Sequence, residues 1–133
     1  MSNGKIVLMV DDDPNILSAF ADFFRKEECR MIASSSAEEA MGILCQHSID
    51  LIITDIRLKE QSGITFLLEV KRIRSFLPVI VITGYPDLIG EEDVKRLGAN
   101  YLFVKPLDLE KLRDAVRTCL WRGNTAQSNF SVR

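Results

Sequence analysis

Short hydrophobic runs alternate along the chain with longer stretches in which apolar residues recur three or four positions apart. Near-continuous apolar runs are typical of strands that are covered on both faces, and the longer spacing is typical of amphipathic helices. The predicted strands are Ile6 to Val10, Arg30 to Ala33, Leu51 to Thr54, Val79 to Thr83 and Tyr101 to Val104. The predicted helices are marked by Ile16, Phe20, Phe23 and Phe24, by Ala37, Ala40, Met41 and Leu44, by Ile64, Leu67 and Leu68, by a weaker pattern around Leu88 to Leu97, and by Leu109, Leu112, Val116 and Cys119.

Residues at the predicted helix ends support this division. Asp13 and Pro14 provide an N-cap and a proline at the first helical position, Gly98 suits a left-handed helix ending, and Asp108 is placed to cap the last helix. Strands that alternate with helices predict a parallel sheet with helices on both faces. We therefore expect a flavodoxin-like (βα)5 three-layer α/β sandwich, with a five-stranded parallel sheet in the order 2-1-3-4-5.

The length of 133 residues fits one domain with a single core. An apolar fraction of 47% and a charged fraction of 27% are ordinary for a globular protein. We expect residues 1–4 to form an N-terminal extension and residues 5–121 to form the domain. Residues 122–133 lose the periodic pattern and are predicted to be a flexible tail or the start of a linker.

Charge and hydropathy exclude several classes of partner. A net charge of −2 offers no broad basic surface, so we expect no nucleic-acid binding by this segment. No stretch approaches the ~20 apolar residues that span a bilayer, and the short polar start lacks a signal-peptide core. Cys29, Cys45 and Cys119 fit buried, reduced thiols, which predicts a cytoplasmic location. The single histidine, His47, is predicted to end a helix and not to bind zinc.

Polar residues follow four of the predicted strands. Asp11 and Asp12 come after the first strand, Asp55 after the third, Thr83 at the end of the fourth and Lys105 after the fifth. Because the carboxyl ends of parallel strands meet at one edge of the sheet, these side chains are expected to form a single site. Acids, a hydroxyl and an amine suit a divalent cation and a phosphate.

The segments Ile-Val-Leu-Met-Val-Asp-Asp-Asp, Ile-Ile-Thr-Asp, Val-Ile-Thr-Gly and Phe-Val-Lys-Pro resemble those of the response-regulator receiver (CheY-like) domains of two-component signal transduction. Asp12, Asp55, Thr83 and Lys105 are separated by 43, 28 and 22 residues, as in that family, and Gly63 falls at the position of the family's loop glycine. The resemblance covers residues 5–121, and it implies that the lysine–proline peptide bond of the last segment is cis.

The resemblance implies that Asp55 is a nucleophile that takes a phosphoryl group from a sensor histidine kinase or a phosphotransfer protein, with Mg²⁺ as cofactor. Lys105 would neutralise phosphoryl oxygens and the Thr83 hydroxyl would donate a hydrogen bond to one of them. Such a domain is not an enzyme acting on a separate substrate, because it catalyses its own phosphorylation and dephosphorylation. The implied metal ligands are Asp11 (through water), Asp12, Asp55 and the main-chain carbonyl of Arg57.

In receivers the threonine and an aromatic residue of the last strand form a switch, and the aromatic position is Leu102 here. We expect Leu102 to change its packing, and Tyr101 to face the opposite side of the sheet. The surface of the fourth helix, the last strand and the last helix is the implied output face for an output domain, a partner protein or a homodimer. Arg57 and Tyr85 are expected to overhang the site and to set the lifetime of the acyl phosphate.

Two other functions remain open from the sequence. A degenerate receiver would serve as an interaction module without accepting phosphate, and Leu102 keeps that possibility open. An aspartate-nucleophile phosphatase of the haloacid dehalogenase type would use Asp11 and would leave Asp55 unexplained. Against the phosphatase, Asn15 stands where that motif has Thr or Val, no acidic pair follows Lys105, and there is no room for a cap domain.

Overall fold

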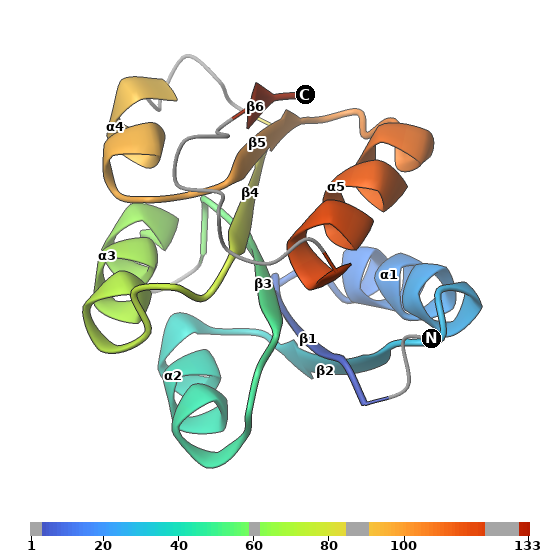
Figure 1. Cartoon of the computed structure of the whole chain (residues 1–133), viewed down its shortest axis with the longest axis horizontal. Coiled ribbons are helices and arrows are strands. Elements are labelled where there is room, and N and C mark those ends of the chain that lie inside the picture. Colours follow the sequence, from blue (N-terminus) through green and yellow to red (C-terminus); the bar gives the residue numbers. More distant parts are fainter. Residues whose placement is uncertain (1–3, 59–61, 85–90, 122–130) are drawn as a thin grey trace.

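The computed structural model describes residues 4–58, 62–84, 91–121 and 131–133 of the chain. Helices and strands alternate along these segments (Figure 1). The strands are β1 (Ile6–Val10), β2 (Arg30–Ser34), β3 (Leu51–Asp55), β4 (Val79–Thr83), β5 (Tyr101–Val104) and β6 (Ser131–Val132). The helices are α1 (Pro14–Lys26), α2 (Ala37–Gln46), α3 (Gly63–Ile73), α4 (Glu91–Arg96) and α5 (Leu109–Trp121).

The strands form one parallel sheet in the order β2-β1-β3-β4-β5-β6. Its first five members confirm the predicted order 2-1-3-4-5. The two-residue β6 was not predicted, and it pairs in parallel with the outer edge of β5. A parallel pair needs a crossover of a dozen or more residues, and α5 lies within the connection between these two strands.

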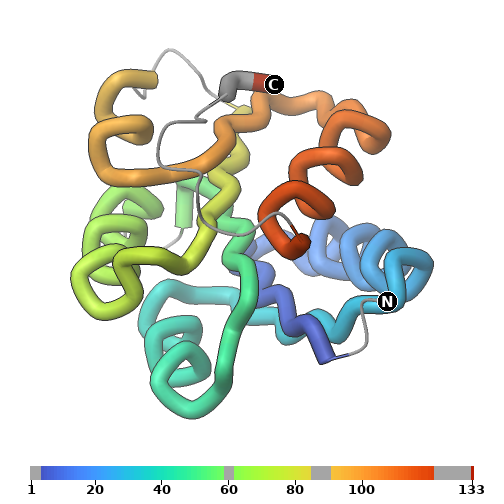
Figure 2. Tube along the Cα trace, in the orientation of Figure 1, coloured from blue at the N-terminus to red at the C-terminus, as the bar shows by residue number. Residues whose placement is uncertain are grey.

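Helices cover both faces of the sheet, as Figures 1 and 2 show. One buried cluster joins the sheet to α2, α3 and α4 and includes Leu8, Ile52, Phe66 and Leu102. The other joins the sheet to α1 and α5 and includes Phe24, Ile53, Tyr101 and Phe103. Leu102 and Tyr101 therefore face opposite sides of β5, which confirms the prediction from strand alternation.

The helix ends confirm the predicted boundary residues. The Asp13 side chain accepts a hydrogen bond from the Asn15 N–H at 2.9 Å, and Asp108 accepts one from Glu110 N–H at 3.0 Å. Gly98 has a φ of +96°, the left-handed conformation that glycine tolerates. The fourth helix begins at Glu91, and the earlier part of its predicted range lies outside the described residues.

The cysteines confirm one prediction and correct another. All three are free thiols, but only Cys119 is buried, whereas Cys29 is half-buried and Cys45 is exposed. Cys45 follows Leu44, which packs against the sheet, so its side chain points from the outer side of α2. His47 is the C-cap residue of α2, as predicted. None of the helices in the described segments is long and apolar enough to cross a membrane.

Candidate functional site

The register of the sheet brings the predicted site residues to one edge. Asp55 is paired with Ile82, so it lies beside the residue that precedes Thr83, and Thr83 is paired with Val104, which precedes Lys105. Val10, which precedes Asp11, is paired with Thr54 on the other side of β3. Asp11, Asp55, Thr83 and Lys105 therefore lie at the carboxyl ends of neighbouring strands, with Thr83 one residue and Lys105 two residues beyond the level of Asp55.

Asp55 occupies the middle of this edge, where three groups of the chain contact it. Its side chain is nearly buried, with a residue exposure of 8%. One carboxylate oxygen, Oδ2, lies 3.2 Å from Lys105 Nζ, and the other, Oδ1, accepts a hydrogen bond from Arg57 N–H at 2.8 Å. The main-chain carbonyl of Asp55 accepts a hydrogen bond from Thr54 Oγ1 at 2.9 Å. The carboxylate is thus oriented by a main-chain donor while its other oxygen faces a cation.

Asp11 is the most deeply buried acid of the site, with an exposure of 1%. Its Oδ1 accepts a hydrogen bond from Asp13 N–H at 2.8 Å, whereas its buried Oδ2 has no hydrogen-bond partner among the described residues. Burial raises the pKa of Asp11 to about 6, with a smaller upward contribution from the charge of Asp55. Burying a carboxylate oxygen without a hydrogen-bond donor destabilises the folded state unless the oxygen binds a proton or a cation.

The loop after β3 approaches the site backbone closely at Gly63. A Cβ atom at this position would lie 2.6 Å from the Asp55 carbonyl oxygen and 2.7 Å from Ile56 Cα. The Gly63 N–H donates to the Ile56 carbonyl at 2.8 Å, and Arg57 forms an antiparallel bridge with Ser62. Glycine at this position therefore permits the start of α3 to lie against the backbone of Asp55 and Ile56, whose atoms leave no room for a side chain.

Thr83 and Lys105 are joined through the backbone as well as through the sheet register. Thr83 is fully buried, and its carbonyl accepts a hydrogen bond from Lys105 N–H at 2.8 Å. The Lys105–Pro106 peptide bond is cis, as the resemblance implied. A Cβ atom at Gly84, the residue after β4, would lie 3.6 Å from Lys105 Cδ, so the lysine stem passes close to this position.

The residues available to a cation are hard oxygen donors. Among the described residues, no group of three or more acidic, histidine or cysteine side chains is assembled closely enough to hold a metal ion. The unpartnered Asp11 Oδ2 and the neighbouring Asp55 carboxylate nevertheless fit Mg²⁺, which keeps several waters and is commonly held by one or two carboxylates. Asp12 is half-buried beside Asp11, and the Arg57 side chain is exposed.

This arrangement supports attack by a carboxylate on an electrophile that carries negative charge. Of the three predicted acids, Asp55 is the one that contacts the ammonium group of Lys105. Negative charge that develops beside Asp55 Oδ2 is therefore stabilised by the positive charge of Lys105. Histidine is absent from the described residues of this edge, so the chain offers no imidazole base here. Phosphoryl transfer depends mostly on positioning and on charge stabilisation, which these groups can supply.

The sequence predicted which residues meet at this edge of the sheet but not the contacts that orient them. Side-chain type and strand-end position were sufficient to find Asp11, Asp55, Thr83 and Lys105. The main-chain donors at Asp13 and Arg57 carry no side-chain signal and were missed. Gly84 belongs to the Val-Ile-Thr-Gly segment, but that segment does not predict its approach to the lysine stem. Tyr85 lies outside the described residues.

Comparison with known proteins agrees with this geometry. The family model described as response regulator receiver domain matches residues 7–117. The sporulation initiation phosphotransferase F of Bacillus subtilis is 33% identical over 120 residues, which cover 90% of this chain and 96% of that protein. A receiver domain from Clostridium thermocellum superposes with a TM-score of 0.83 at 28% identity, covering 89% of this chain and 95% of that one.

A further solved structure similar to this chain contains a metal ion. The response regulator TrrA of Thermotoga maritima, in complex with Mg²⁺ and beryllium fluoride, superposes with a TM-score of 0.80 at 25% identity, covering 87% of this chain and 99% of that one. Other curated relatives are longer proteins, among them transcriptional regulatory proteins, and the chain spans 26% to 54% of their length.

Proposed function

Since this chain belongs to the receiver domains of two-component response regulators, we propose that it accepts a phosphoryl group on Asp55 from a histidine kinase or a phosphotransfer protein. The observation that carries the proposal is the Asp55 carboxylate, which is oriented by Arg57 N–H and lies 3.2 Å from Lys105 Nζ at the shared strand edge. The domain acts as the phosphoacceptor and catalyses its own phosphorylation and dephosphorylation, so it is not an enzyme with a separate substrate.

In the proposed transfer, an Asp55 carboxylate oxygen forms a bond to phosphorus while the bond from phosphorus to the donor histidine nitrogen breaks. The histidine nitrogen leaves with the electron pair, and Asp55 becomes an acyl phosphate. Oδ2 is the oxygen we assign to this role, because Arg57 N–H already engages Oδ1. Lys105 then exchanges its contact with the carboxylate for a contact with the phosphoryl oxygens, and Thr83 donates its hydroxyl to one of them.

We assign Mg²⁺ binding to Asp11, Asp12, Asp55 and the main-chain carbonyl of Arg57. When bound, the ion neutralises the crowded carboxylates and the phosphoryl oxygens. Asp11 would act through water, and its buried Oδ2 lacks a hydrogen-bond partner among the described residues. Addition of MgCl2 at pH 7.5 is expected to raise the thermal midpoint of the wild-type protein and to have a much smaller effect on Asp11→Asn. Equal rises in both proteins would contradict the assignment.

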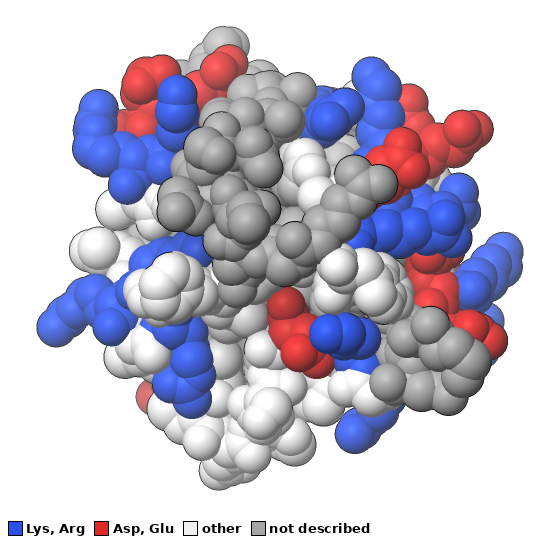
Figure 3. Space-filling view, viewed as in Figure 1, with Lys and Arg blue, Asp and Glu red and all other residues white. Residues whose placement is uncertain are grey.

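For the signal, we propose that phosphorylation biases an equilibrium between two arrangements of the α4–β5–α5 face through Thr83 and Leu102. Leu102 is buried at 1% exposure in the cluster on the α4 side of the sheet. Strand alternation in β4 places Thr83 on the same side as Val79 and Val81, which belong to this cluster, so we expect a change at Thr83 to alter the packing of Leu102. Charges of both signs gather over α4 and over α5 in Figure 3. An output domain, a partner protein or a second copy of the chain is the expected reader of this face.

The proposal is tested by incubating the protein with acetyl phosphate and MgCl2 and measuring its intact mass. The wild-type protein and the control Asp108→Asn, which alters an exposed helix cap, are expected to gain one phosphoryl group. Asp55→Ala is expected to gain none. A wild-type protein that stays unmodified would support a degenerate receiver instead, and a modification lost in Asp11→Asn but kept in Asp55→Ala would support the phosphatase-type nucleophile.

A further inference from the structure

The outer edge of β5 is paired with the chain's own C-terminal residues. Tyr101 is in register with Ser131 and Leu102 with Val132. Beyond β6, Arg133 continues the pairing, since its N–H donates to the Leu102 carbonyl at 2.7 Å and its carbonyl accepts from Val104 N–H at 3.0 Å. The guanidinium carbon of Arg133 also lies 5.8 Å from the centre of the Tyr101 ring, within the range of a cation–π contact.

The N–H groups of Val104, the last residue of β5, and of Lys105, which follows it, are bonded on opposite sides of the strand. Val104 N–H points outward to Arg133, whereas Lys105 N–H points inward to the Thr83 carbonyl on β4. Without the C-terminal residues, the outward N–H of Val104 and the carbonyl of Leu102 would be unpaired at the end of the sheet. Such an edge is a template for pairing with another chain.

This edge lies between α4 and α5 (Figure 1), on the face proposed above as the output face. The described part of β5 is four residues long and its outward groups are main-chain atoms, so any extended segment can satisfy them. A covalently attached segment competes for them at high effective concentration, which favours the chain's own C-terminal residues over a second molecule.

We propose that the outer edge of β5 is a strand-docking site that the chain fills with its own segment Ser131–Arg133, and that this pairing keeps the edge from associating with a second copy of the chain. The proposal does not depend on phosphorylation of Asp55. Its tests use the unphosphorylated protein, so its failure and the failure of the phosphoacceptor function are separate results.

The pairing is tested by amide hydrogen exchange in two variants at one position. Arg133→Pro removes the N–H that donates to Leu102, and Arg133→Ala keeps that N–H while removing the guanidinium group. We expect Val104 N–H to exchange about tenfold faster or more in Arg133→Pro than in the wild-type protein, and Arg133→Ala to stay close to wild type. Lys105 N–H, which is bonded to β4, serves as the internal control and should remain protected in all three proteins.

The shielding role is tested by sedimentation over a range of protein concentrations. Arg133→Pro is expected to self-associate at lower concentration than the wild-type protein and Arg133→Ala. The proposal is overturned if Val104 N–H exchanges in the wild-type protein as fast as an unpaired amide, or equally fast in both variants. Identical sedimentation of all three proteins would also overturn it.

Discussion

The Asp11 carboxyl group is buried at 1% exposure, and this burial makes its protonation sensitive to pH. Burial raises its pKa to about 6 from the usual 3.8, and its Oδ2 has no hydrogen-bond partner among the described residues. In the folded protein the carboxyl group therefore keeps its proton at a pH where the unfolded chain has lost it. The folded state is favoured by this group at low pH and loses that advantage as pH rises from about 4 to about 6.

Without divalent cations, the free energy of unfolding of the wild-type protein is therefore expected to fall between pH 4 and pH 7 relative to that of Asp11→Asn. The expected difference across this range is on the order of 2–3 kcal/mol. Asn keeps an oxygen that can accept from Asp13 N–H but does not ionise. The difference in the free energy of unfolding between the two proteins is measured by urea unfolding in EDTA at several pH values. Parallel pH profiles for the two proteins would show that Asp11 does not titrate in this way.

Gly63 and Gly42 form a matched pair of glycines, since a Cβ atom at Gly63 meets backbone atoms at 2.6 to 2.9 Å and one at Gly42 meets nothing within 4 Å. Gly63→Ala is expected to lower the free energy of unfolding by about 1–3 kcal/mol, because the backbone under Asp55 must shift. Gly42→Ala, in exposed helix, is expected to raise it by about 0.5–1 kcal/mol.

Urea midpoints measure both changes, and phosphorylation by acetyl phosphate measures their effect on the site. We expect the rate to fall in Gly63→Ala and to be unchanged in Gly42→Ala. A Gly63→Ala protein with wild-type stability would show that the loop after β3 is not held as closely as the structure indicates.

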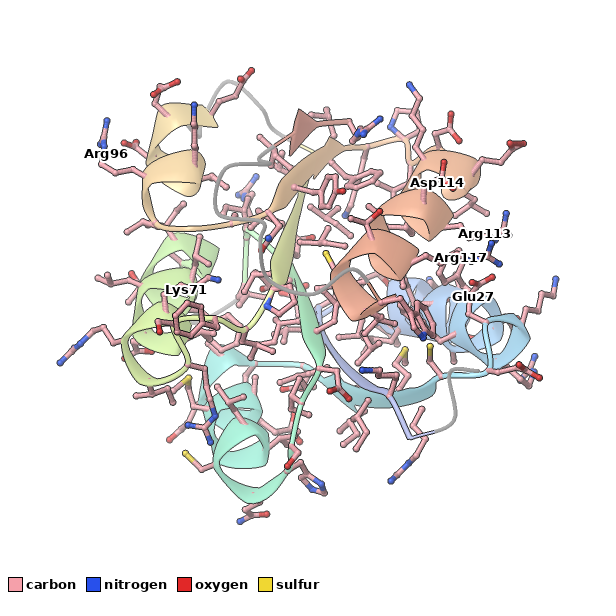
Figure 4. The ribbon with its side chains drawn as sticks, in the orientation of Figure 1. Glu27, Lys71, Arg96, Arg113, Asp114 and Arg117 are labelled. Carbon is pink, nitrogen blue, oxygen red and sulfur yellow. The ribbon has the colours of Figure 1, made fainter. Side chains whose placement is uncertain are left out.

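At the scale of elements, an ion-pair group joins α1 to α5. Glu27 caps the C-terminal end of α1, and its side chain is only 6% exposed. Its carboxylate pairs with Arg113 Nε at 3.0 Å and with Arg117 Nε at 2.9 Å, and Figure 4 shows the three side chains meeting between the two helices. The Asp22–Arg25 pair of α1 is exposed on both sides and provides a control.

We predict that Glu27→Ala lowers the free energy of unfolding by about 1–3 kcal/mol, because Arg113 and Arg117 lose the carboxylate that they share. The loss is smaller than for a fully buried ion pair, because both arginine side chains are partly exposed. Asp22→Ala is expected to change it by no more than about 0.5 kcal/mol. Equal changes in the free energy of unfolding for Glu27→Ala and Asp22→Ala would show that the buried Glu27 ion pairs stabilise the protein no more than the exposed Asp22–Arg25 pair.

The elements themselves were largely predictable from the sequence. Three of the five predicted strands have the observed bounds, and β2 and β3 each extend one residue further, to Ser34 and Asp55. Four of them, β1, β3, β4 and β5, were found because they are buried almost throughout and are therefore nearly all apolar, whereas β2 is partly exposed and begins at Arg30. β6 could not be found in this way, because two residues, Ser131 and Val132, show no periodicity and pair through main-chain atoms.

The site was predictable for a different reason. In a parallel sheet, the residue that follows a strand is directed to a known edge, so the strand pattern was enough to place Asp55, Thr83 and Lys105 together. The ion-pair group at Glu27 could not be predicted, because residues 86 and 90 positions away must meet it through the packing of α1 against α5.

At the scale of the whole molecule, the sheet separates two cores, and β5 presents a different residue to each. Tyr101 contacts the α1 and α5 side, and Leu102 contacts the α4 side. In crystal structures with and without beryllofluoride and Mg²⁺, we expect Leu102 to repack while Tyr101 stays on its side of the sheet. A Tyr101 ring that moved to the α4 side of the sheet would contradict this prediction.

The most direct measurement of the central claim locates the modified residue. The protein is incubated with acetyl phosphate and MgCl2, the acyl phosphate is reduced with borohydride, and the peptides are mapped by mass spectrometry. We predict that the reduced side chain is found at position 55 and is absent from Asp55→Ala. Reduction at Asp11 or Asp12, or no reduced residue in a protein that retains its fold, would contradict the account.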